Sequence, residues 1–289
     1  MTVPIPPRWR GLLLTAPALA VVAFAGGALL LAVRGSIADG LGRGWTLSAY
    51  AGFLHDPAFA DSLLLSLKIA TLSTTVSAAL ALAVVGAVSA SRRGRAALET
   101  AARATLAVPH LLAASAFGLL LSGSGIVSRL THAVGWTDGS AGFPVLVAGP
   151  TPGAVLLTYV WKEAPFVTIM LLAAYTPAVR DLESAVRTLG AGRLRRLRHV
   201  TLPLLAPALT EACLLVFGFT FAAYEVPALL GATVPGALPV EAVELYRSVE
   251  LDDRPAALAL AVVIGMVIAL VALAAATISR RLLRARTGS

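Results

Sequence analysis

The sequence predicts an all-α integral membrane protein with six transmembrane helices and both termini in the cytoplasm. Of its 289 residues, 58% are hydrophobic and 13% are charged, whereas a soluble domain is about one quarter charged. The apolar residues gather into six runs, and a helix of about 20 residues crosses the hydrocarbon of a bilayer. The runs are residues 11–33, 63–89, 105–122, 152–175, 202–224 and 256–278.

The first run, residues 11–33, contains no charge and follows Arg8 and Arg10. A signal peptide is the alternative interpretation, because basic residues precede the run and residues 23–25 resemble a cleavage site. The apolar run continues well beyond that point, so we favour a retained anchor helix. The outer segment that follows, residues 34–61, is polar and aromatic and is expected to include a short interfacial helix.

The other runs differ in the polar residues that they contain. These are Lys68 in the second run, Pro109-His110 in the third, Lys162-Glu163 in the fourth and Glu211 in the fifth, while the sixth has no charge. We expect Lys68 to reach outward to water, and His110 to be a packed, hydrogen-bonded side chain. Residues 126–130, after the third run, are predicted to form a short amphipathic helix.

The charges between the runs alternate in sign along the chain. Sixteen basic residues and three acids flank the spans on one side, against five basic residues and ten acids on the other. Cytoplasmic flanks of membrane proteins carry the excess of Lys and Arg, so this alternation supports six spans with cytoplasmic termini. The basic residues are spread over short loops without stacking aromatic residues between them, which argues against nucleic-acid binding.

The longest predicted cytoplasmic loop, residues 177–201, has the pattern of two short helices joined by a glycine. The first helix would have an apolar face formed by Leu182, Ala185, Val186 and Leu189. Gly190 would then supply the left-handed conformation that ends a helix, and Pro203 would begin the fifth span. A loop that only connected two spans would be shorter and less patterned.

The residues of this loop resemble those of a known family, the permease subunits of binding-protein-dependent ABC importers with the type I fold. The signature of that family is Glu-Ala-Ala, three residues, Gly, nine residues, and then Ile-x-Leu-Pro. The chain has the same spacing, from Ser184-Ala185-Val186 through Gly190 to Val200-Thr201-Leu202-Pro203. Ser184 and Val186 replace the Glu and the second Ala, and a glutamate stands one position earlier, at Glu183.

Residues 161–166 and 221–227 also resemble segments of one subgroup, which imports polyamines, phosphonates, thiamine or related small polar solutes. We therefore divide the chain into three parts. They are an N-terminal anchor helix with its outer loop at residues 1–62, an importer transmembrane domain at residues 63–281, and a basic cytoplasmic tail at residues 282–289.

The resemblance implies a permease in the bacterial inner membrane that works by alternating access and has no enzymatic activity. It also implies three kinds of partner besides membrane lipid, and no nucleic acid. These are two cytoplasmic ABC ATPase subunits, a second permease chain, identical or paralogous, and an external solute-binding protein. Neither Lys68 nor Lys162 lies in a phosphate-binding P-loop, so ATP and Mg²⁺ are expected to be bound by the partner ATPase, and this chain is expected to hold no cofactor or metal.

The resemblance further makes the loop at residues 177–201 the coupling helix that an ATPase moves. The residues expected to carry this coupling are Leu182, Glu183, Ser184, Ala185, Val186, Leu189, Gly190, Val200, Leu202 and Pro203. The apolar face of the first helix would dock on the ATPase, while Gly190 would set the angle between the two helices.

Ionisable residues inside the spans cost about 2.5 to 3.5 kcal/mol each to insert, so they normally face the bundle interior or water. Lys162 and Glu163 are adjacent and point about 100° apart on a helix, so at least one needs another partner, for which Glu211 is a candidate. The pair could line the translocation path or form a buried interhelical contact, and both interpretations stay open. The candidates for the path are Tyr159, Lys162, Glu163, Glu211, Tyr224 and Glu225.

Two alternative functions remain at this stage. An ion- or proton-coupled secondary transporter would use Lys162, Glu163 and Glu211 as relay groups and would transport without an ATPase. An intramembrane enzyme would need a nucleophile with its base, or a set of metal ligands, and the sequence offers neither.

Overall fold

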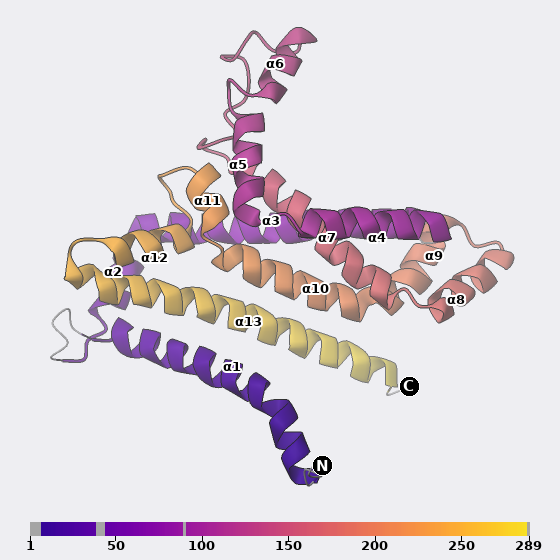
Figure 1. Ribbon diagram of the computed structural model, residues 1–289, viewed down its shortest axis with the longest axis horizontal. Coiled ribbons are helices and arrows are strands. Elements are labelled where there is room, and N and C mark those ends of the chain that lie inside the picture. Colours follow the sequence, from indigo (N-terminus) through magenta and orange to yellow (C-terminus); the bar gives the residue numbers. More distant parts are fainter. Residues whose placement is uncertain (1–6, 39–43, 89–90, 288–289) are drawn as a thin grey trace, which may run out of the picture. The chain divides into compact units, whose positions relative to one another are not determined.

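A computed structural model describes residues 7–38, 44–88 and 91–287 of the chain (Figure 1). In these residues the regular structure is helical, and the only β pairing is an isolated bridge between Ala38 and Trp45. The longer helices are α1 (Pro7–Ser36), α3 (Pro57–Val88), α4 (Arg92–Leu106), α5 (His110–Leu121), α7 (Gly153–Ala174), α8 (Pro177–Thr188), α10 (Leu202–Ala222), α12 (Leu238–Arg247) and α13 (Arg254–Thr287). The shorter ones are α2 (Ser48–His55), α6 (Ile126–Ala133), α9 (Arg193–Arg196), α11 (Glu225–Leu230), a π-helical turn (Leu197–Thr201) and a 3-10 turn (Leu251–Asp253).

Six helical stretches of the described chain are long and apolar enough to cross a membrane, which confirms the predicted number. They are Thr15–Ser36, Pro57–Ala87, His110–Ala133, Gly153–Ala174, Arg193–Ala222 and Leu251–Thr277. Short helices are also present where they were expected, as α2 and α6. Asp39 and Arg43 of the expected outer loop lie outside the described residues, and so do the side chains of the expected tail at residues 282–289.

The chain divides into two compact units. They are Met1–Pro57 with Glu241–Val263, and Ala58–Val240 with Ile264–Ser289. In the first unit, the hydroxyl groups of Ser36 and Tyr50 lie 2.6 Å apart, and Gly35 approaches Leu258 so closely that a Cβ would collide with its side chain. The second unit contains the segments that the sequence analysis connected with function.

Helix α7 lies at the centre of the second unit, where it packs against α4, α5 and α10. One apolar cluster joins its last turns to α3 and α10, through Val85, Val167, Leu171, Leu205 and Val216 among others. A second cluster joins its first turns to α5 and α11, through Ala114, Val155, Tyr159, Val226 and Leu230 among others. Because burying apolar side chains is favourable, the two clusters hold the last turns of α7 against α3 and α10, and its first turns against α5 and α11.

The third predicted run, residues 105–122, is not one continuous helix. The chain leaves α4 at Leu106 and starts α5 at His110, and Figure 1 shows α5 turning sharply away from α4. Pro109 explains the break, because proline has no amide hydrogen and disfavours a helical conformation in the residue before it, here Val108. Helix α4, which the sequence analysis treated as loop, instead lies along α7.

The fifth span begins earlier than the predicted residue 202. Helix α9, the π-helical turn and α10 follow one another without a break, so that the helical stretch starts at Arg193. The second short helix of the predicted loop is therefore the first part of this span. The widened π turn ends immediately before Leu202-Pro203, where proline supplies no amide for a regular helical hydrogen bond.

Candidate functional site

The coupling segment, which we define as residues 177–203, has the predicted form of a helix, a glycine and a second helical stretch. Leu182, Ala185 and Leu189, which were expected to face a partner, are exposed in the described chain, Leu182 to 47% and Leu189 to 85%. Val179, by contrast, is buried and anchors the start of α8. The segment thus has an apolar face available on one side and a fixed base on the other.

Gly190 ends α8 in a left-handed conformation, with φ of +82°. Its amide donates to the carbonyl of Arg187 over 3.0 Å, and the amide of Ala191 donates to the carbonyl of Val186 over 3.3 Å. These two hydrogen bonds form the Schellman motif, which typically places glycine at this position. The expected role of Gly190 in setting the direction of the chain therefore has a clear geometric basis.

Glu183 of α8 forms hydrogen bonds to residues at the ends of two membrane helices. Its Oε2 accepts a hydrogen bond from the hydroxyl of Tyr175 over 2.6 Å, and its Oε1 accepts one from the hydroxyl of Thr201. Tyr175 directly follows α7, and Thr201 is the last residue of the π turn before α10. Ser184, at the position of the family's glutamate, is exposed.

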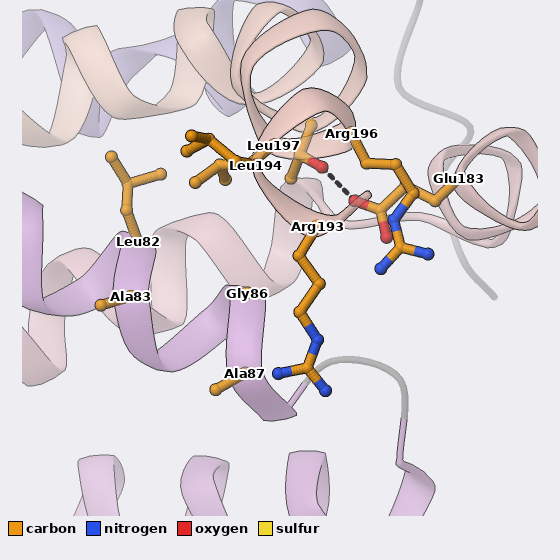
Figure 2. Close-up of a pocket in the computed structure, with 10 residues that line it drawn as sticks. Leu82, Ala83, Gly86, Ala87, Glu183, Arg193, Leu194, Arg196 and Leu197 are labelled. Carbon is orange, nitrogen blue, oxygen red and sulfur yellow. Dashed lines mark hydrogen bonds between the residues drawn. The ribbon is translucent and has the colours of Figure 1, made fainter. Parts of the chain in front are cut away.

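A pocket of about 360 Å³ lies beside this contact, between the end of α3 and the second half of the coupling segment. Figure 2 shows Leu82 and Gly86 of α3 on one side of it, and Leu194 and Arg193 on the other. The hydrogen bond that Glu183 accepts from Thr201 borders the same space.

Arg95 of α4 also binds the end of α7. Its guanidinium donates to the carbonyls of Leu172 over 2.7 Å and Tyr175 over 3.1 Å, and it is held by the carboxylate of Glu99 over 3.0 Å. A cation at the C-terminus of a helix satisfies carbonyls that have no partner within the helix and interacts favourably with the helix dipole. In the sequence, Arg95 was interpreted only as one of the sixteen basic residues that indicate the cytoplasmic side.

Lys162 lies in the middle of α7 and is only 2% exposed. Its ammonium group donates to the carbonyls of Val108 over 2.6 Å, Thr105 over 3.0 Å and Leu106 over 3.4 Å. These carbonyls lie where α4 ends and the chain breaks before α5. Lys162 therefore gives the C-terminus of α4 the partners that the broken helix no longer supplies.

Glu163 binds the start of the next helix. Its Oε1 lies 2.9 Å from Nε2 of His110, the first residue of α5, and the His110 ring packs 4.7 Å from that of Phe219 in α10. This confirms the packed, hydrogen-bonded His110 predicted from the sequence. The suggested pairing with Glu211 is wrong, because Lys162 and Glu163 face the two sides of the break, while Glu211 is exposed on α10.

The structure brings only part of the predicted translocation set together. Tyr159 lies one turn before Glu163 on α7 and is completely buried, its ring edge-on to Phe219, and its hydroxyl has no hydrogen-bond partner in the described chain. Glu225, which is exposed at the start of α11, lies within electrostatic range of that hydroxyl. No three His, Cys, Asp or Glu side chains of the described residues gather as metal ligands would.

Replacing Arg95 with methionine is expected to destabilise the protein. The substitution leaves the carbonyls of Leu172 and Tyr175 without their donor, and the loss of such hydrogen bonds costs about 1 to 3 kcal/mol. Thermal unfolding in detergent measures the change. Arg93→Met is the matched control, because Arg93 is an exposed residue of the same helix, and equal midpoints for the two variants would contradict the role assigned to Arg95.

The comparisons with known proteins agree with this geometry. Residues 78–286 match the family described as "Binding-protein-dependent transport system inner membrane component". The chain belongs to this family. The permease is therefore a multi-pass component of a transport system in the inner membrane, and the family is not one of enzymes.

The permease is similar to several named permeases of transport systems. It is 32% identical over 83 residues to the sulfoquinovosyl glycerol transport system permease protein SmoG of Agrobacterium fabrum, an alignment that covers 29% of this chain and 27% of SmoG. It is 26% identical over 247 residues to the sn-glycerol-3-phosphate transport system permease protein UgpA of Yersinia enterocolitica, covering 83% and 82% of the two chains. The match to SmoG thus spans much less than two thirds of that protein.

A solved structure supports the fold of the permease. A chain of the bacterial alginate ABC transporter, crystallised with an alginate pentasaccharide-bound periplasmic protein, matches with a TM-score of 0.72 at 21% identity. The match covers 94% of the permease and 96% of that chain. The two named relatives correct the sequence-based assignment to the polyamine, phosphonate or thiamine subgroup, because their names refer to sulfoquinovosyl glycerol and sn-glycerol-3-phosphate.

Proposed function

We propose that the permease forms the translocation path of an ATP-driven ABC uptake system for a small polar solute. The observation that carries the proposal is the coupling segment. Its apolar face, with Leu182 and Leu189, is exposed, while its base joins directly to α7 and α10, which are long enough to cross a membrane. Motion of a protein docked on that face would pass into both helices.

The proposal includes the partners that such a segment requires. Two cytoplasmic ATPase subunits would bind ATP and Mg²⁺ and dock on the coupling segments of two permease chains, identical or paralogous. An external solute-binding protein would deliver the cargo. The excess of arginine in the flanks that include the coupling segment supports a cytoplasmic position for it and for both termini.

The cargo proposed here is a polyhydroxylated solute, such as a sugar or a sugar phosphate. Support comes from the relatives, whose names refer to sulfoquinovosyl glycerol and sn-glycerol-3-phosphate. Hydroxyl-rich cargo suits a path with hydrogen-bonding and aromatic groups rather than a dense set of charges.

Of the path candidates, we propose that Tyr159, Tyr224 and Glu225 serve the solute. The buried hydroxyl of Tyr159 has no hydrogen-bond partner in the described residues, so it is available to a solute when the path opens. Lys162 and Glu163 are engaged with α4 and α5, which supports the buried interhelical interpretation for this pair. Glu211, which is exposed on α10, stays a candidate for the path.

Reconstitution tests this function. The tagged chain, purified from its native membrane together with its associated subunits, is placed in proteoliposomes with ATP inside or outside. We expect uptake of labelled sn-glycerol-3-phosphate or of an alginate oligosaccharide to depend on ATP and on the binding protein, with putrescine as a comparator solute. Uptake by the chain alone, driven by a proton or sodium gradient without an ATPase, would contradict the proposal and support the secondary transporter, which family membership does not favour.

A further inference from the structure

We propose that Tyr175, Glu183 and Thr201 form a brace that fixes the coupling helix α8 to α7 and α10, and that Glu183 is a positioning residue for coupling. The inference rests on the proposed function, because it concerns how ATP-driven motion of α8 reaches the membrane helices. The proposal gives a role to Glu183, which lies one position before the first residue of the family's signature.

In the brace, the carboxylate of Glu183 joins α8 to the end of α7 and to the turn before α10. Each oxygen of Glu183 accepts a hydrogen bond from a different hydroxyl, that of Tyr175 at the end of α7 and that of Thr201 before α10. Figure 2 shows the second of these bonds at the edge of the pocket. Because a carboxylate is an acceptor at both oxygens, it can hold both hydroxyl donors at once.

The surroundings make these hydrogen bonds persistent. Tyr175 is 1% exposed and Thr201 is 3% exposed, so water has little access to replace either donor. The acceptor, Glu183, is part-buried, and a hydrogen bond to an ionised acceptor is shorter and about twice as strong as a neutral one. The brace therefore resists a force that would pull α8 away from the two helices.

The end of α7 is also bound by a second charged residue. Arg95 of α4 donates to the carbonyl of Tyr175, the residue whose hydroxyl binds Glu183. Farther along α7, Lys162 binds the far end of α4. Displacement of α8 at Glu183 would thus move α7 and α4 together, rather than bending the short connection at residues 175–177.

Backbone connections and apolar packing alone would transmit force less directly. The first turn of α8 remains anchored by buried Val179 without the brace, so we expect variants that lack the brace to keep the helix and its docking face. Their coupling helix would, however, tilt against α7 and α10 when the ATPase moves. ATP would then be hydrolysed with little movement of the helices that form the translocation path.

Tyr175→Phe and Thr201→Val test the brace, singly and together, because each removes a hydroxyl donor and nearly preserves the shape of the side chain. Thr201→Ser keeps the hydroxyl and is the conservative variant. Ser184→Ala is the matched control, because Ser184 is exposed beside Glu183. The reconstituted complex is assayed for ATP hydrolysis and for solute uptake, and the number of ATP molecules hydrolysed per solute is compared.

The double variant is expected to retain ATP hydrolysis while uptake falls, so that this ratio rises by at least about tenfold through the loss of two charge-assisted hydrogen bonds. Thr201→Ser and Ser184→Ala should keep the wild-type ratio. An unchanged ratio in the double variant, or a parallel fall of hydrolysis and uptake, would overturn the brace. If the double variant fails to assemble, the single variants decide by the same ratio.

The same assay separates this proposal from the function on which it rests. Wild-type complexes that show no ATP-dependent uptake of any solute tested would contradict the proposed function and the brace together. Normal wild-type uptake, combined with an unchanged ratio in the variants, would contradict the brace alone.

Discussion

A Gly190→Val substitution is expected to abolish ATP-driven transport while leaving membrane insertion intact. Gly190 has a φ of +82°, where an L-residue pays roughly 1 to 2 kcal/mol and a β-branched side chain is a marked outlier. Apart from its chain neighbours, no atom of the described residues lies within 4 Å of the position that a Cβ would take, so the penalty comes from the backbone alone. Valine therefore favours a different chain direction after α8 without disturbing the packed core.

The expected result follows from the size of this penalty. It is small compared with the roughly 5 to 15 kcal/mol that stabilise a folded domain, so the helices should still insert and pack. It falls, however, on the residue that sets the angle between the docking face and α10. Uptake in proteoliposomes and the amount of chain in the membrane fraction measure the two effects separately.

Gly192→Val is the matched control for this prediction. Gly192 likewise has no atom of the described chain, other than its neighbours in sequence, within 4 Å of its Cβ position, but its φ of −66° and ψ of 166° are open to valine. Asparagine tolerates the left-handed conformation better than other non-glycine residues, so Gly190→Asn should transport at an intermediate rate. Normal uptake by Gly190→Val, or an equal loss in Gly192→Val, would contradict the assigned role of Gly190.

Replacing Lys162 with methionine is expected to produce the largest loss of stability. Methionine has a similar length but no donor, so the carbonyls of Thr105, Leu106 and Val108 lose the ammonium group that binds them. Inside a membrane there is little water to replace that partner. Each buried group left unsatisfied costs about 1 to 3 kcal/mol, so a total of several kcal/mol is expected.

The unfolding midpoint in detergent and the yield of monodisperse protein measure this loss. Lys68→Met provides the control, because it makes the same chemical change at an exposed lysine of α3. We expect Lys68→Met to behave like the wild type. A Lys162→Met variant that unfolds at the wild-type temperature would show that Lys162 does not hold the break between α4 and α5.

Much of the architecture could be predicted from local sequence. The number of spans follows from the length of the apolar runs, and it agrees with the six stretches in the structure. The position of Gly190 at the end of α8 follows from the periodicity before it, and the Schellman motif confirms it. Both features depend on residues that are neighbours along the chain, where spacing alone carries the information.

The break in the third run was visible only in part. The sequence places Pro109 in the run, but the arginines before it predict a loop because they are typical of a water-facing segment. The structure makes it helix α4, whose Leu98 packs against the apolar cluster of α7 and α10. An amphipathic helix beside a membrane bundle has the charge content of a loop, so composition did not distinguish the two.

The polar contacts of the site depended on residues distant in sequence. Arg95 reaches Tyr175 across 80 positions, and His110 reaches Glu163 across 53. The sequence offered Glu211 as a candidate partner for the Lys162-Glu163 pair, but Lys162 binds the end of α4 and Glu163 binds His110. His110 was recognised as a hydrogen-bonding residue, but not as the partner.

Composition, the spacing of apolar residues and the pattern around Gly190 determined the membrane class, the six spans and the likeness to importer permeases, because each is a local or periodic property of the chain. Tertiary structure decided the partners of Lys162, Glu163 and Glu183. Several donors and acceptors could satisfy each of these side chains, and only the packing of α4, α5 and α10 around α7 brings particular ones within hydrogen-bonding distance.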